Sequence, residues 1–203
     1  MKIIVCVVIG YLLGSLNPAA LISKLKRKSL RENGTGNLGA TNTMLVFGKK
    51  LGAFVMLFDI LKGFLAVSIA MLLAPDIEWL TLASGFSAIV GHCFPFYLKF
   101  RGGKGLATFA GAVLAYSPII FVLLLISGLV IMLIVNHGFI LPYYASSVFA
   151  VFVCVTCREP ISGVLAVSMS ALLMIMHFGN LLKAKNGQDI KIRAYIQSKK
   201  MKK

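Results

Sequence analysis

The feature that most constrains this chain is a series of long apolar stretches joined by short polar or basic turns. Hydrophobic residues make up 59% of the 203 residues and charged residues only 13%, and a soluble domain of this length needs far less apolar surface. We therefore predict an all-α integral membrane protein. Seven transmembrane helices are expected, at residues 3–22, 51–73, 79–98, 106–116, 119–135, 139–155 and 161–182.

The distribution of Lys and Arg predicts how these helices are oriented. Of the 21 Lys and Arg, Lys2 and Arg158 fall on one side, Lys62 lies within a stretch, and the remainder lie on the other side. Cytoplasmic loops carry the excess of basic residues, so we expect the N-terminus outside and the C-terminus in the cytoplasm. Residues 1–182 are predicted to form one membrane domain, and residues 183–203 a basic cytoplasmic tail that lies against anionic lipid.

Composition argues against two kinds of site. The formal net charge of +15 does not indicate nucleic-acid binding, because the basic residues lie between apolar stretches and are not interleaved with aromatic residues. A metal centre is not expected, because the cysteines have no His or carboxylate partner at metal-ligand spacing. Cys154 and Cys157 form a C-x-x-C pair, which we interpret as small residues inside a helix, with a redox role as the alternative.

A glycine-rich basic segment, here called the second glycine loop, covers residues 99–105 and reads Lys-Phe-Arg-Gly-Gly-Lys-Gly. Glycines let backbone N–H groups turn toward a bound anion, and a helix beginning after Gly105 would aim its positive end at the same place. The segment is not the nucleotide P-loop, because Gly follows Lys104 and no strand precedes it. We predict a phosphate-binding loop, with a plain basic cytoplasmic loop as the alternative. Its candidate residues are His92, Arg101, Gly102, Gly103 and Lys104.

The first glycine loop covers residues 33–42 and is expected on the same side of the membrane. It reads Asn-Gly-Thr-Gly-Asn-Leu-Gly-Ala-Thr-Asn, so glycines alternate with hydroxyl and amide side chains. Such a segment can hold or orient a polar ligand, and a plain turn is the alternative. Its candidate residues are Thr35, Asn37, Gly39, Thr41 and Asn42.

Polar and small residues inside the apolar stretches predict helix contacts. Gly10 and Gly14 form a pair that lets another helix approach closely. Asn17 interrupts the first stretch, and a broken backbone at membrane depth is tolerated only where protein or a cavity satisfies it. Asp59 and Lys62 share one helix face at i and i+3, so we favour a structural ion pair for them over a catalytic role.

Histidines stand at the predicted cytoplasmic ends of three helices. His177 is the most informative of them, because Asn180 follows three residues later on the same helix face. These two residues can orient a polar substrate group and transfer a proton. We expect both glycine loops and this pair to meet at one aqueous mouth that binds phosphate, with an acyl chain between the helices behind it.

Seven motifs occur in order along almost the whole chain. They are Tyr-Leu-Leu-Gly-Ser (11–15), Gly-Thr-Gly-Asn-Leu-Gly-Ala-Thr-Asn (34–42), Asp-x-x-Lys-Gly (59–63), Gly-His-x-Phe-Pro (91–95), Phe-Arg-Gly-Gly-Lys-Gly-x-Ala-Thr (100–108), Ser-Pro (117–118) and His-x-x-Asn (177–180). In this order and spacing they resemble the bacterial membrane glycerol-3-phosphate acyltransferases that use acyl phosphate as donor.

The resemblance implies transfer of a fatty acyl group to the sn-1 hydroxyl of glycerol 3-phosphate, which gives lysophosphatidic acid and begins phospholipid synthesis. It implies seven helices in the bacterial inner membrane, a site facing the cytoplasm, and no metal, nucleotide or other cofactor. The expected partners are the two substrates and the lipid bilayer, and the expected state is a monomer, with an oligomer left open. The implied catalytic residues are Thr35, Lys104, His177 and Asn180.

The chain also departs from the family pattern. Thr35 stands where the family has Ser and keeps the hydroxyl. Leu45 stands where the family has a substrate-binding Arg, and Phe139 and Pro142 occupy the place of two family Ser. Losing a desolvated Arg fork costs about 2–5 kcal/mol, or roughly thirty-fold to several thousand-fold in binding. Either another basic residue (Lys49, Lys50 or Arg101) compensates, or the chain is a repurposed paralogue that binds or carries a phosphorylated lipid precursor without acyl transfer.

Overall fold

The structure is a computed structural model that describes residues 1–188 and 191, and the regular elements in that part are all helices. The all-α prediction is confirmed for these residues. By internal contacts the chain divides into two compact units, Met1–Pro118 and Ile119–Lys203, and each is described by itself. Most of the predicted tail at residues 183–203 lies outside the described residues.

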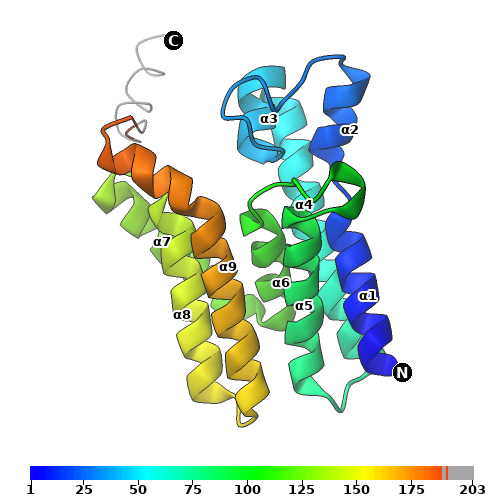
Figure 1. The fold of residues 1–203 in the computed structure, drawn as a ribbon. Coiled ribbons are helices and arrows are strands. Elements are labelled where there is room, and N and C mark those ends of the chain that lie inside the picture. The colour runs from blue at the N-terminus through cyan, green and yellow to red at the C-terminus, as the bar shows by residue number, and fades with distance from the viewer. Residues whose placement is uncertain (189–190, 192–203) are drawn as a thin grey trace. The chain divides into compact units, whose positions relative to one another are not determined.

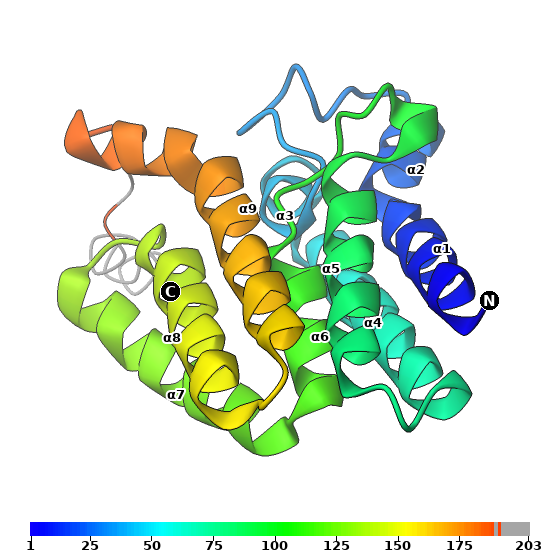
Figure 2. The same cartoon turned by 60° about the horizontal axis from the view of Figure 1, so that its bottom comes forward.

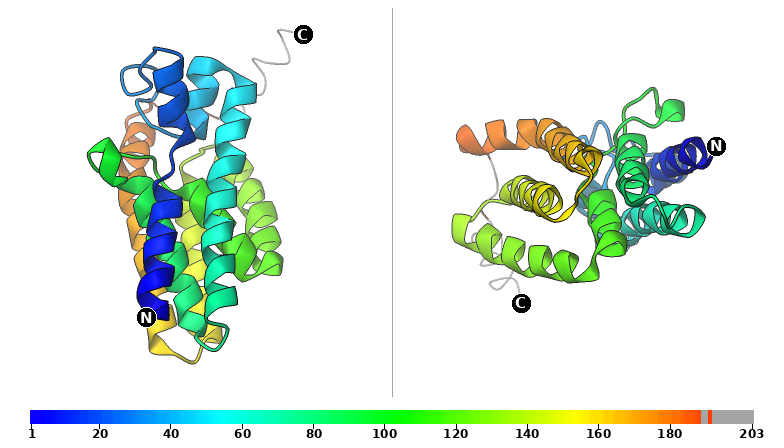
Figure 3. Two further views of the ribbon diagram at one scale, coloured as in Figure 1. Left: turned by 90° about the vertical axis from the view of Figure 1, so that its right-hand side faces the viewer. Right: turned by 90° about the horizontal axis from the view of Figure 1, so that it is seen from below.

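The first unit contains α1 (Lys2–Ser15), α2 (Pro18–Leu25), α3 (Ala40–Phe47), α4 (Lys49–Leu73), α5 (Glu78–Cys93), a 3-10 helix (Phe96–Leu98) and α6 (Leu106–Tyr116). The long helices form a bundle, in which α1 packs on α4 and α5, and α6 packs on α4 (Figure 3). The two short helices α2 and α3 lie together at one end of this bundle (Figure 1). Both glycine loops belong to this unit.

Glycines let the helices of the first unit approach closely. A Cβ built at Gly14 of α1 would overlap the backbone of Ala88 on α5, and Gly10 meets α5 in the same way one turn earlier. The predicted role of Gly10 and Gly14 is therefore confirmed. On α4, Gly63 lies equally close to the Thr108 carbonyl of α6. Close contact between helix backbones stabilises membrane bundles, so these glycines fix the helices that carry the polar residues described below.

The second unit contains α7 (Pro118–Val135), α8 (Ile140–Thr156) and α9 (Pro160–Lys185). The short turn between α8 and α9 makes them antiparallel neighbours (Figure 2). α8 buries Phe149 and Val153, and α9 buries Leu173. The hydroxyls of Ser146 and Ser170 hydrogen-bond across the interface at 3.0 Å, which satisfies two polar groups inside an apolar contact.

Five helical segments of the described chain are long and apolar enough to cross a membrane. They are Lys2–Leu25, Lys49–Leu73, Glu78–Leu98, Pro118–Val135 and Pro160–Lys185. The other two predicted stretches form α6 and α8, which are apolar but shorter. The 11 residues of α6 rise only about 16 Å, roughly half the thickness of a hydrocarbon core. The figure of seven crossings therefore stays a prediction.

The structure differs from the sequence-based expectation at two places in the first unit. The expected single helix at residues 3–22 is two helices, because Pro18 has no N–H to continue α1 and instead begins α2. The short helix α3 was not predicted, since its first residues belong to the first glycine loop. Both differences bring polar backbone to the end of the bundle where the glycine loops lie.

Candidate functional site

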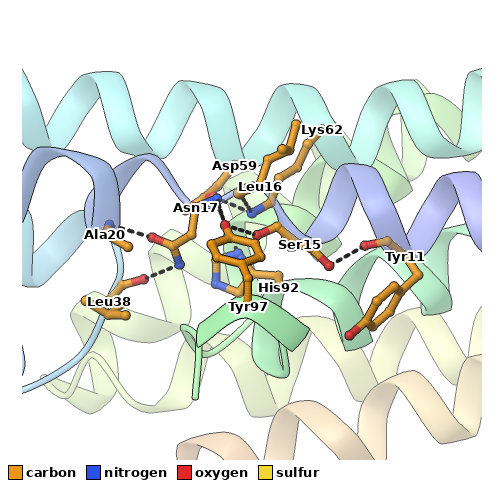
Figure 4. Close-up of polar contacts among 10 residues, drawn as sticks. All are labelled: Tyr11, Ser15, Leu16, Asn17, Ala20, Leu38, Asp59, Lys62, His92 and Tyr97. Carbon is orange, nitrogen blue, oxygen red and sulfur yellow. Dashed lines mark hydrogen bonds and ion pairs between the residues drawn. The ribbon is translucent and has the colours of Figure 1, made fainter. Parts of the chain in front are cut away.

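The break between α1 and α2 is closed by the side chain of Asn17. Its Oδ1 accepts the N–H of Ala20 at 2.8 Å and so caps α2, while its Nδ2 donates to the Leu38 carbonyl in the first glycine loop at 3.3 Å. Figure 4 shows both contacts. One side chain therefore caps a helix and ties it to the first glycine loop.

Two further side chains satisfy the remaining backbone groups of this break. The Tyr97 hydroxyl donates to the Ser15 carbonyl at 2.7 Å and accepts the N–H of Asn17 at 3.1 Å. Lys62 of α4 donates to the Leu16 carbonyl at 2.7 Å. The prediction that protein satisfies the broken backbone is confirmed, and the partners come from α4 and from the 3-10 helix.

A buried cluster of charged groups lies beside the break (Figure 4). Lys62 Nζ is 2.8 Å from Asp59 Oδ1, which confirms the predicted ion pair. His92 of α5 is a third member, with its Nδ1 3.4 Å from the same carboxylate oxygen. Asp59 and Lys62 are each 2% exposed and His92 is 3% exposed. The structure places the His92 ring inside this cluster, and its predicted contact with substrate stays a prediction.

Asn42, on the first turn of α3, shapes the first glycine loop. Its amide nitrogen donates to the carbonyls of Leu30, Asn33 and Asn37 at 2.8, 3.1 and 2.9 Å. Its Oδ1 accepts the N–H of Thr35 at 2.7 Å, and the residue is fully buried. Because the donors of this amide are already engaged, we assign Asn42 to holding the loop in shape, and its binding to substrate stays a prediction.

The second glycine loop closes the C-terminal end of α5. Gly102 donates its N–H to the Cys93 carbonyl at 2.8 Å, and Gly103 donates to the His92 carbonyl at 3.1 Å. These donors satisfy carbonyls that the end of a helix leaves unpaired. The expectation that these two N–H groups turn toward an anion is corrected, since both are used within the loop. Lys104 follows them directly and is half-buried.

The two glycine loops meet at Gly103. A Cβ built there would overlap the Nε2 edge of His92 and would lie 2.9 Å from the Leu38 carbonyl oxygen of the first glycine loop. Only glycine fits between these groups. A second contact lies beside this one, because the guanidinium of Arg31, two residues before the first glycine loop, donates to the Arg101 carbonyl of the second. The predicted convergence of the two loops is therefore seen at these contacts.

The remaining candidate residues of the first unit differ in exposure. Thr35, Thr41 and Arg101 are exposed, and Asn37 is half-buried. Gly39 is buried and stands at the N-cap of α3. The left-handed Gly105, with φ of 85°, precedes α6, whose N-terminal N–H groups therefore begin directly after Lys104. The basic residues Arg101 and Lys104 thus directly precede a helix N-terminus, an arrangement that suits an anionic ligand.

The second unit carries His177 and Asn180 on the last turns of α9. His177 is buried, and its Nδ1 lies 2.9 Å from the Leu173 carbonyl. A carbonyl only accepts, so Nδ1 carries the proton and Nε2 is the basic nitrogen of the neutral ring. Asn180 is half-buried. The expectation that this pair meets the glycine loops stays a prediction. Among the described residues, no group of three or more His, Cys, Asp or Glu could hold a metal ion.

Comparisons with known proteins give one consistent result. A family model described as glycerol-3-phosphate acyltransferase matches residues 4–187. The protein of that name from Enterococcus faecalis is 34% identical over 220 residues, covering 100% of this chain and 98% of the relative. The one from Bacillus velezensis is 32% identical over 194 residues, covering 95% of this chain and 99% of the relative. The one from Geobacillus kaustophilus is 37% identical over 187 residues, covering 91% and 93%.

Two solved structures of PlsY (YgiH), an integral membrane glycerol 3-phosphate acyltransferase, are similar to this chain. The glycerol 3-phosphate form has a TM-score of 0.87 and 31% identity, and covers 95% of this chain and 96% of that protein. The lysophosphatidic acid form has a TM-score of 0.85 and 30% identity, and covers 96% and 97%. The similarity in sequence and in fold thus extends over nearly the whole length of this chain and of the proteins it matches.

Proposed function

The chain belongs to the glycerol-3-phosphate acyltransferase family, and on this premise we propose the acyl donor, the membrane orientation and the residue roles with which it acylates glycerol 3-phosphate. The donor is a fatty acyl phosphate and the product is lysophosphatidic acid. The site faces the cytoplasm of a bacterial cell, and the chain crosses the inner membrane seven times as a monomer. The distribution of Lys and Arg supports this orientation.

The observation that carries the proposal is the meeting of the two glycine loops at Gly103, beside Lys104 and the N-terminus of α6. Both substrates of this reaction carry phosphate, so they repel each other. Fixed cations and helix N–H groups offset this repulsion and hold the reacting groups together. Lys104 and Arg101 are the proposed phosphate-binding residues. Thr35, Asn37 and Thr41 are the proposed donor-orienting residues.

In the proposed reaction the sn-1 hydroxyl oxygen attacks the acyl carbonyl carbon of the mixed anhydride. A new ester bond forms, the bond between that carbon and the phosphate oxygen breaks, and inorganic phosphate leaves. The hydroxyl proton passes to His177 Nε2 or to the departing phosphate. Asn180 is the proposed orienting residue for glycerol 3-phosphate. The tautomer that the Leu173 carbonyl imposes on His177 supports the first of these two proton acceptors.

A purified protein assay tests this proposal. Palmitoyl phosphate and glycerol 3-phosphate are expected to give lysophosphatidic acid and inorganic phosphate in equal amounts. Palmitoyl-coenzyme A, offered in place of the acyl phosphate, is expected to give none. Turnover with the thioester and none with the acyl phosphate would refute the proposed donor. Binding of both substrates without product would instead favour a carrier role.

A further inference from the structure

We propose that Asp59 and His92 are positioning residues, which set the place of Lys104 through Gly103. The inference rests on the proposed function, because it assigns residues that act on the same site. Asp59 lies on α4 and His92 on α5, and they face each other through Oδ1 and Nδ1 at 3.4 Å. Both side chains are buried, so neither is placed to contact a dissolved substrate directly.

The path from His92 to Lys104 consists of two contacts with one residue. The His92 carbonyl accepts the N–H of Gly103 at 3.1 Å. The Nε2 edge of the His92 ring also lies against the Cα of Gly103, where no Cβ would fit. His92 therefore touches Gly103 from its backbone and from its side chain. A change in the ring position displaces Gly103, and Lys104 is the next residue.

Asp59 fixes the other edge of the His92 ring. His92 Nδ1 faces the carboxylate at ion-pair distance, and the opposite Nε2 edge of the ring faces Gly103. Asp59 itself is held by Lys62 at 2.8 Å, and Lys62 also donates to the Leu16 carbonyl at the break between α1 and α2. Figure 4 shows this chain of contacts from the break to His92.

The same arrangement holds the first glycine loop in place. Gly103 is packed between the His92 ring and the Leu38 carbonyl, and the Leu38 carbonyl accepts a hydrogen bond from Asn17 at the break. The break therefore contacts the first glycine loop through Asn17 and the second through Lys62, Asp59 and His92. From the sequence, Asp59 was expected to form a structural ion pair with Lys62. The contact of its partner His92 with Gly103 gives this pair a role in placing the site.

The test compares single and double variants of the purified full chain by kcat/KM for glycerol 3-phosphate. His92→Ala and Gly103→Ala are each expected to lower kcat/KM by about tenfold or more, since each displaces Lys104. In the His92→Ala background the imidazole ring is absent, so the methyl group added by Gly103→Ala no longer overlaps it. In that background the fold-decrease in kcat/KM caused by Gly103→Ala is expected to be about tenfold smaller than in wild type, because substitutions at residues in direct contact are not additive. An equal effect in both backgrounds would overturn the proposal.

Ser87→Ala provides the matched control. Ser87 is buried on the same helix, five residues before His92, and donates to the Val7 carbonyl of α1 at 2.6 Å. In the Ser87→Ala background the decrease in kcat/KM caused by Gly103→Ala is expected to be the same as in wild type, because losing a hydrogen bond elsewhere on α5 leaves the contact between His92 and Gly103 intact. If His92→Ala or Gly103→Ala fails to fold, Asp59→Asn is combined with Lys104→Ala. Asp59→Asn is then expected to lower kcat/KM in the wild-type background and to cause no further decrease in the Lys104→Ala background. If the decreases from the two substitutions multiplied in the double variant, the proposal would be overturned.

Hydrogen exchange separates a failure of this inference from a failure of the proposed function. The amides of Gly102 and Gly103 donate to α5 carbonyls, and their exchange is measured without substrate. They are expected to exchange about tenfold faster in His92→Ala than in wild type or Ser87→Ala. Unchanged exchange overturns the positioning role whatever the enzyme does. If the wild-type protein makes no lysophosphatidic acid, the proposed function is refuted. The exchange rates of Gly102 and Gly103 then still show whether His92 positions the second glycine loop.

Discussion

Replacing Asn42 by Ala separates a structural role from a substrate-binding role in the first glycine loop. The substitution removes the acceptor of the Thr35 N–H and the two amide N–H donors that the carbonyls of Leu30, Asn33 and Asn37 share. At about 0.5–1.5 kcal/mol for each of these three hydrogen bonds, the folded state loses about 1.5–4.5 kcal/mol. The partners are buried or part-buried backbone groups, so the upper half of this range applies where water does not replace the amide.

The assay is thermal unfolding in detergent combined with steady-state kinetics. For a chain of this length, 1 kcal/mol corresponds to about 2–4 °C in Tm, so Asn42→Ala is expected to unfold at least about 3 °C lower. The KM values for both substrates are expected to rise because the loop carrying Thr35 loses its shape. Asn42→Asp is expected to be as harmful, because a carboxylate cannot donate to the three carbonyls.

Thr41→Ala is the matched control for this substitution. Thr41 is the neighbouring residue, is exposed, and is proposed to orient the donor. Its loss is expected to change KM or kcat while Tm stays within about 1 °C of wild type. If Asn42→Ala behaved in that way, with altered kinetics and unchanged Tm, Asn42 would be a ligand-binding residue and the structural reasoning would be wrong.

Further variants test the other parts of the site. Lys104→Ala is expected to lower kcat/KM by about tenfold to a hundredfold, the effect of one charged hydrogen bond, without lowering Tm; a rate equal to wild type would remove Lys104 from the mechanism. Leu45 is 57% exposed on α3, so Leu45→Arg is expected to fold and to raise kcat/KM above that of Leu45→Gln by restoring the family cation. Tyr97→Phe removes two hydrogen bonds at the break and is expected to cost about 1–3 kcal/mol, seen as a lower Tm. His177→Ala is expected to lower kcat by about a hundredfold or more if His177 takes the proton, and by clearly less if the departing phosphate does.

The sequence predicts those parts of the fold that depend on local pattern. Apolar length places the long helices to within a few residues, and the four-residue spacing of Gly10 and Gly14 identifies a surface for close helix packing. The i, i+3 spacing of Asp59 and Lys62 places them on one face of α4, and they pair as expected. The two glycine loops were expected on one side of the membrane, and they meet at Gly103.

The sequence does not predict which polar groups form hydrogen bonds within the protein and are therefore not available to a ligand. Asn42 and Thr41 are neighbours with similar chemistry, yet one is buried with its amide engaged and the other is exposed. In the sequence, the N–H groups of Gly102 and Gly103 are suited to bind an anion. In the structure they donate to carbonyls at the end of α5, a contact that the sequence does not indicate. His92 joins Asp59 only because α5 packs against α4, a tertiary contact without a spacing rule. The available signal for His92 was a polar residue at the end of an apolar stretch, three residues before Pro95.

The initial rate of lysophosphatidic acid formation from palmitoyl phosphate and glycerol 3-phosphate, measured for wild type, Thr35→Ala and Lys104→Ala, decides whether acyl transfer takes place at the junction of the two glycine loops. The wild-type protein is expected to form product, and a variant in either glycine loop is expected to have a lower kcat/KM with Tm unchanged. Product formation at the wild-type rate by both variants would place the chemistry away from the junction of the two loops and contradict the account.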